Sequence, residues 1–147
     1  MSVRVGVSGS LRALAEDSAR RATQIVMGEL SAALQQSFTA PVWAWPRPTV
    51  RSGGVTVGSP RNIIDTATLR QSHTWAMSGP YQATYSWSAQ YASIVHDGAV
   101  VGRKVRTILP ARPWTRAVVG TERVSGIEPF PLDHRLRDVW LGYMRRG

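Results

Sequence analysis

Three histidines and nine acidic residues are the side chains with which this sequence could perform acid–base or metal chemistry. His73, His96 and His134 lack the paired spacing of a helical zinc site, and the sequence contains no cysteine to support them. Asp97 follows His96, but adjacent residues on a helix do not face each other, so we expect Asp97 to end a helix before Gly98. The acids are scattered, whereas a metal-dependent nuclease needs clustered carboxylates. We therefore predict no metal, no cofactor and no enzymatic activity, and we rank a nuclease last among the candidate functions.

Two short patterns resemble catalytic or phosphate-binding loops but fail on their spacing. The stretch from Gly98 to Lys104 has the wrong glycine spacing for a phosphate loop, and no serine or threonine follows the lysine. Ser8 lies between Val7 and Gly9, which does not make the G-x-S-x-G turn of a serine hydrolase.

The strongest electrostatic signal is an excess of positive charge. Eighteen basic residues stand against nine acidic ones, for a formal net charge of +9, which attracts polyanions or acidic protein surfaces. The stretch 98–121 contains no acid, and four of its cations are predicted to face a DNA channel or an acidic partner: Arg103, Lys104, Arg106 and Arg116. A solvated loop and strand face is the alternative. No helix-turn-helix pattern or aromatic stacking platform accompanies these cations, so sequence-specific DNA binding is not predicted.

Residues 40–60 form a segment rich in proline and tryptophan. Prolines at 41, 46 and 48 exclude a helix and disfavour a central strand, and Trp43 and Trp45 would point the same way in an extended chain. We predict an extended inter-subunit arm whose deletion leaves the rest of the domain folded. Tryptophan and arginine are favoured interface anchors, and the predicted subunit interface comprises Trp43, Trp45, Arg47, Arg51, Arg112 and Trp114.

The elements that must position these residues indicate one α+β domain over residues 1–147, with a small, mostly antiparallel sheet covered by a long N-terminal and a C-terminal helix. No apolar run approaches the ~20 residues that cross a bilayer, and the start lacks signal-peptide features, so we expect a protein made in the cytoplasm with no membrane partner. The predicted elements are a strand over 3–7, a helix over 11–37 capped by Ser8 or Ser10, a helix over 66–72 capped by Asp65, strands over 73–77 and 81–87, a helix over 90–96, a basic loop and strand over 100–109, and a helix over 132–146.

Three stretches, in this order, resemble segments of one protein family. Residues 61–72 (RNIIDTATLRQS) resemble a D-T-G-x-L-x-x-S segment, residues 91–98 (YASIVHDG) a Y-A-x-x-x-H-x-G segment, and residues 108–114 (ILPARPW) an I-P-A-R-P-F segment that precedes a helix. These segments are typical of the neck, tail-completion or minor head–tail connector proteins of tailed bacteriophages. Ala67 replaces the usual glycine, which is compatible with a helical turn.

The resemblance implies a structural virion protein that forms a homo-oligomeric ring, commonly six- or twelve-fold. Such a ring lies in the virion neck between the portal-side connector proteins and the tail-tube proteins, where it completes or terminates the tail and where non-specific contact with packaged DNA is expected. A minor tail or baseplate protein and a small basic nucleic-acid-binding protein are the alternatives.

Overall fold

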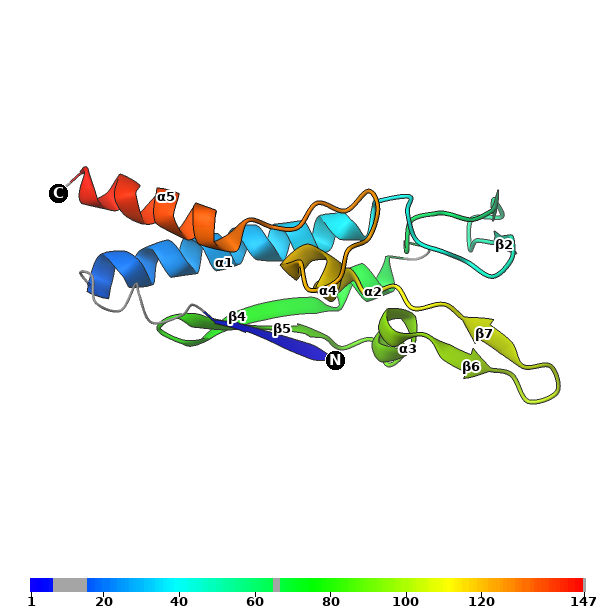
Figure 1. The fold of residues 1–147 in the computed structure, drawn as a ribbon. Coiled ribbons are helices and arrows are strands. Elements are labelled where there is room, and N and C mark those ends of the chain that lie inside the picture. Colours follow the sequence, from blue (N-terminus) through cyan, green and yellow to red (C-terminus); the bar gives the residue numbers. More distant parts are fainter. Residues whose placement is uncertain (7–15, 65–66, 147) are drawn as a thin grey trace.

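The computed structural model describes residues 1–6, 16–64 and 67–146, and it confirms the α+β prediction. Figure 1 shows an elongated molecule with helices and sheet in layers at one end and two hairpins projecting from the other. The predicted caps Ser8 and Ser10, and the predicted first turn of the long helix, lie outside the described residues.

The main sheet has three antiparallel strands in the order β1 (Ser2–Gly6), β5 (Gln82–Trp87) and β4 (His73–Gly79). The predicted hairpin of β4 and β5 is confirmed, and the alternation along β5 buries one set of side chains, so that Ala83 and Tyr85 are both fully inaccessible. β1 pairs with the other edge of β5, with Val3 opposite Tyr85.

The helix α1 (Glu16–Ser37) lies between this sheet and the helix α5 (Leu132–Met144) (Figure 1). One face of α1 contributes Met27, Leu30 and Leu34 to the core. Tyr85 donates its hydroxyl to the carbonyl of Met27 at 2.7 Å, which ties the sheet to the helix. Two contacted sides explain why the apolar stripe of α1 is so broad.

Glu29 lies beside that apolar stripe because it pairs with α5. Both of its carboxylate oxygens accept hydrogen bonds from Arg135, at 2.9 and 2.7 Å. These hydrogen bonds from Arg135 hold the pKa of Glu29 below its usual range.

Short elements connect the layers: α2 (Thr68–Gln71), α3 (Ala92–Asp97) and α4 (Trp114–Val119). The helix predicted over 66–72 is shorter, because α2 begins at Thr68 with Ala67 at its N-cap; Asp65, the predicted cap, lies outside the described residues. Ala67 adopts a left-handed conformation with φ 64°, so the expected helical turn at that residue is wrong. A left-handed residue favours glycine, the residue type at this place in the family segment.

The projecting end consists of two hairpins, β2–β3 (Thr49–Val50 and Thr56–Val57) and β6–β7 (Ala99–Val101 and Thr107–Leu109). The sequence predicted an extended arm at 40–60 and a single strand within 100–109. Residues 40–60 instead turn back on themselves, because Trp43 forms an antiparallel bridge with Arg61 through two backbone hydrogen bonds of 3.0 and 2.9 Å.

Candidate functional site

The last two of the family-like segments meet in the structure. The backbone N–H of Arg112 donates to the carbonyl of His96 at 3.0 Å, which joins the end of α3 to the segment 108–114. Gly98 permits this approach, because an added Cβ would lie 2.6 Å from the carbonyl oxygen of Leu109. Gly98 of the second segment and Arg112 of the third segment therefore stabilise the same backbone contact.

Trp114, the aromatic residue that ends the third segment, is fully buried in the core. Its ring lies 5.1 Å from that of Phe38, 5.7 Å from that of Trp87 and 4.7 Å from that of His96. The core thus draws aromatic rings from β5, α3, α4 and the residue that follows α1, and the segment 108–114 anchors the base of the projecting end to it.

Trp45 lies between two guanidinium groups. The centre of the Arg61 guanidinium and that of Arg112 each lie 3.6 Å from the centroid of the indole ring. Arg112 is 1 % exposed and donates from Nε to the carbonyl of Ala44 at 3.0 Å. Burial, and secondarily the charge of Arg61, lowers the pKa of Arg112 to about 10, so it stays a cation at neutral pH.

These contacts correct the predicted subunit interface. Trp43, Arg112 and Trp114 are at most 2 % exposed and lie inside the subunit's own fold, so none of them is an anchor for a neighbouring chain. Trp43 also donates its indole N–H to the carbonyl of Ser37 at 2.9 Å. Trp45 is half-buried by its arginine neighbours. Removal of residues 40–60 would take Trp43 out of the core, so from the structure we now expect this deletion to destabilise the domain rather than leave it folded.

The two remaining predicted interface residues lie on or before the β2–β3 hairpin. Arg47 is exposed, and Arg51 is half-buried and hydrogen-bonds the side-chain oxygen of Asn62. Of the six predicted residues, Arg47 is therefore the most accessible to a partner.

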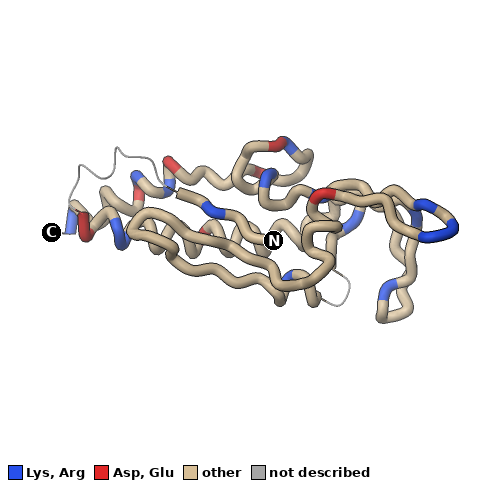
Figure 2. The backbone as a smooth tube through the Cα atoms, turned by 90° about the horizontal axis from the view of Figure 1, so that it is seen from below, with Lys and Arg blue, Asp and Glu red and all other residues tan. Residues whose placement is uncertain are grey.

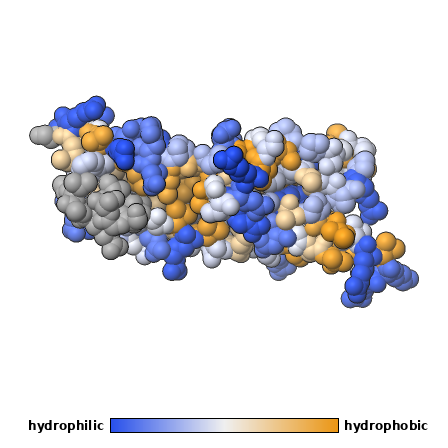
Figure 3. Space-filling view, in the orientation of Figure 1, coloured by the Kyte–Doolittle hydropathy of each residue, from blue (hydrophilic) through white to orange (hydrophobic). Residues whose placement is uncertain are grey.

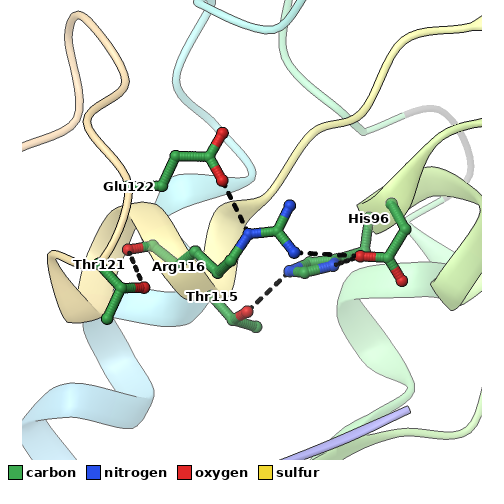
Figure 4. Close-up of polar contacts among 6 residues, drawn as sticks. His96, Thr115, Arg116, Thr121 and Glu122 are labelled. Atoms are coloured by element: carbon green, nitrogen blue, oxygen red, sulfur yellow. Dashed lines mark hydrogen bonds and ion pairs between the residues drawn. The ribbon is translucent and has the colours of Figure 1, made fainter.

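His96, Asp97 and Thr115 form a hydrogen-bonded row, shown in Figure 4. His96 Nδ1 lies 2.6 Å from Asp97 Oδ1, and His96 Nε2 lies 2.7 Å from the hydroxyl of Thr115. The expectation that these two adjacent side chains do not face each other is wrong, because Asp97 is the last residue of α3 and the chain turns at Gly98. The hydrogen bond from His96 is the main reason that the pKa of Asp97 lies below its usual range.

This order of carboxylate, imidazole and hydroxyl is also that of a nucleophilic triad. Thr115 is 3 % exposed and His96 5 %, however, so a substrate carbonyl could not reach the hydroxyl in this conformation. The row instead joins α3 to α4. Within residues 1–6, 16–64 and 67–146, no three His, Asp or Glu side chains gather in a way that could hold a metal ion.

Arg116, which was predicted to face a DNA channel or an acidic partner, pairs with two acids of its own subunit. Its guanidinium contacts Glu122 at 2.7 Å and Asp97 at 3.3 Å (Figure 4), and its side chain is 43 % exposed. Two carboxylates neutralise this charge within the subunit, because the chain returns towards α4 after Gly120. Arg116 belongs to the network that closes α4.

Arg103, Lys104 and Arg106 lie on the turn between β6 and β7, and all three are exposed. Figure 2 shows these basic positions at the far tip of the projecting end. The turn is tight, because Gly102 has φ 105° and an added Cβ would lie 2.1 Å from the carbonyl oxygen of Val105. The three predicted cations are thus brought together and held away from the body of the molecule.

Exposed aliphatic side chains on the same hairpins are the feature that the sequence interpretation missed. Val100 and Ile108 are cross-strand partners on β6–β7 and are 60 % and 72 % exposed. On the other hairpin, Val50 and Val55 are 67 % and 62 % exposed. Figure 3 shows hydrophobic surface next to the hydrophilic tip of the projecting end.

Comparison with protein-family models, with curated proteins and with solved structures finds no match. Among the described helices, none is long and apolar enough to cross a membrane.

Proposed function

We propose that this protein is a structural subunit of the neck of a tailed bacteriophage, which assembles into a ring that completes the tail and joins it to the head. The observation that carries the proposal is the exposed pair of Val100 and Ile108 on a hairpin that projects from a body with its own complete core. A two-stranded hairpin alone is marginally stable in water. A neighbouring subunit that covers this face would both stabilise the hairpin and remove its apolar surface from water.

The family-like segments support the same proposal through their roles in the fold. Gly98 allows the close backbone approach, Arg112 stacks on Trp45, and Trp114 enters the core at the base of the hairpins. Residues with such roles maintain a scaffold that presents the hairpins. A ring of six or twelve copies needs this kind of scaffold and needs no active site.

The β6–β7 hairpin is the proposed contact between subunits, in place of a whole arm at 40–60. Completing the burial of Val100 and Ile108 would contribute about 2–3 kcal/mol at each interface. That amount corresponds to roughly 30- to 150-fold in the dissociation constant of one contact. Every interface of a ring contains the same contact. A small loss of binding free energy at each interface therefore adds up around the ring and prevents assembly.

The test is electron microscopy and light scattering of the full chain, alone and mixed with isolated phage tails. We expect rings, or added density at the head-proximal end of the tail. The double variant Val100→Thr, Ile108→Thr should remain monomeric with an unchanged thermal midpoint. The matched control Leu141→Gln, Met144→Gln removes exposed apolar groups from α5 and should still assemble. Added density at the baseplate would identify a minor tail protein instead, and a wild-type protein that neither assembles nor joins tails would contradict the proposal.

A further inference from the structure

The tip of the β6–β7 hairpin carries a concentration of positive charge that its own chain leaves uncompensated. Arg103, Lys104 and Arg106 lie within five residues on an exposed turn. In the part of the chain that the structure describes, none of the three forms an ion pair. We propose that this tip binds the phosphate backbone of double-stranded DNA without reading its sequence.

Other arginines of this chain, in contrast to the three cations of the tip, form ion pairs within the subunit. Arg116 has two carboxylate partners, and Arg135 has a bidentate one at 2.7–2.9 Å. Such fixed pairs hold elements together. The cations of the tip do not join elements in this way, since β6 and β7 contact chiefly each other. Three like charges held side by side repel one another, and a polyanion relieves this repulsion.

The shape of the tip favours a duplex over an acidic protein surface. A two-stranded β-ribbon is one of the elements that the major groove of B-DNA admits, and a narrow tip can place cations against the phosphates that border a groove. Phosphate contacts carry no sequence information, and three exposed cations on one narrow turn suit them, so backbone contact is the expected mode.

The hairpin therefore combines two surfaces with different ligands. The Val100 and Ile108 face lies along the strands, whereas the cations lie on the turn beyond them. The DNA site does not require the ring. In a ring, however, every subunit would present one tip, and the salt dependence of binding would increase with the number of tips that reach one duplex.

The experiment measures binding of the full chain to a fluorescent 30-base-pair duplex by anisotropy, over a series of salt concentrations. The variant Arg103→Gln, Lys104→Gln, Arg106→Gln is compared with the control Arg20→Gln, Arg21→Gln, Arg137→Gln. The control changes the formal charge by the same amount at exposed positions on α1 and α5. Loss of three phosphate contacts should lower the slope of log K against log salt by about 2.7, which is on the order of 10²–10³-fold in affinity near 0.1 M salt.

The expected result is a steep loss of affinity in the tip variant and a small change in the control. Equal losses in the two variants would mean that only net charge matters and would overturn the site. Unchanged DNA binding by a tip variant that no longer joins tails would assign the tip to a protein partner, which also overturns it. Light scattering on the same samples separates this outcome from the proposed function, because failure to form rings leaves a tip-dependent affinity for DNA intact.

Discussion

Replacing Trp43 by alanine tests whether the proline-rich segment belongs to the subunit core or to an intermolecular arm. Trp43 is 2 % exposed, its indole N–H donates to Ser37, and its backbone bridges to Arg61. Removal of a buried tryptophan side chain destabilises a domain by about 3–5 kcal/mol. For a domain of this size, that corresponds to a fall in the thermal midpoint of roughly 10–15 °C.

Circular dichroism melts and urea titrations of the wild type and the Trp43→Ala variant measure this change directly. Val55→Ala is the matched control, because Val55 lies in the same segment but is 62 % exposed, and its loss should change the stability by less than about 0.5 kcal/mol. If Trp43→Ala kept the wild-type midpoint and only prevented ring formation, Trp43 would be an intermolecular anchor. The core placement argued above would then be refuted.

Three smaller changes follow from single contacts. Ala67→Gly should raise the stability by about 0.5–1 kcal/mol in urea titration, because glycine relieves the left-handed strain at φ 64°; a loss would mean that the strain is absent. Thr115→Val should lower the stability by about 1–3 kcal/mol, since it leaves the buried ring nitrogen of His96 without its partner, whereas Thr121→Val, which removes only a long, exposed hydrogen bond of 3.4 Å to the carbonyl of Arg116, serves as the near-neutral control. The pKa of Asp97 is lowered on folding, so its charged form stabilises the protein above about pH 4 and this contribution is lost as pH falls through the lower folded-state pKa. Thermal melts should therefore show the gap between wild type and Asp97→Asn closing from pH 7 to pH 3, and a constant gap would count against the pair with His96.

Periodic patterns predicted the regular elements well, because each pattern reports on one buried face. The alternation from Tyr81 to Trp87 located β5 and its inward side, and apolar steps of three and four located α1 and α5. The two consecutive residues Asp97 and Gly98 correctly marked the end of α3. In all these cases the decisive interaction is local or depends only on which residues are apolar.

Pairings between distant segments could not be predicted in the same way. Glu29 and Arg135 are separated by 106 positions, and neither residue indicates the other from sequence. The charge of Arg116 looked available because the stretch around it lacks acids, yet Glu122 lies one position beyond that stretch and returns to it. Trp43 was assigned to a partner because prolines surround it, although prolines limit the backbone and do not determine what the indole ring contacts.

The candidate site was predicted in part. Arg103, Lys104 and Arg106 lie together on an exposed turn because charge and a glycine turn act locally. The aliphatic pair of Val100 and Ile108 was missed, because its meaning depends on a cross-strand register that only the structure supplies. Exposure of such a pair is visible only when the whole fold is known.

The strand order β1-β5-β4 has a consequence for the timing of synthesis. Val3 can pair with Tyr85 only after Tyr85 has been synthesised. Tyr85 leaves the ribosome about 80 residues later, which is roughly 4–16 s at 5–20 residues per second. The β4–β5 hairpin forms from neighbouring residues, so it provides the template on which the first strand closes the sheet. During that interval the sheet-facing side of α1 remains exposed on the nascent chain. A holdase chaperone that binds this protein would therefore bind this apolar face of α1 at that stage.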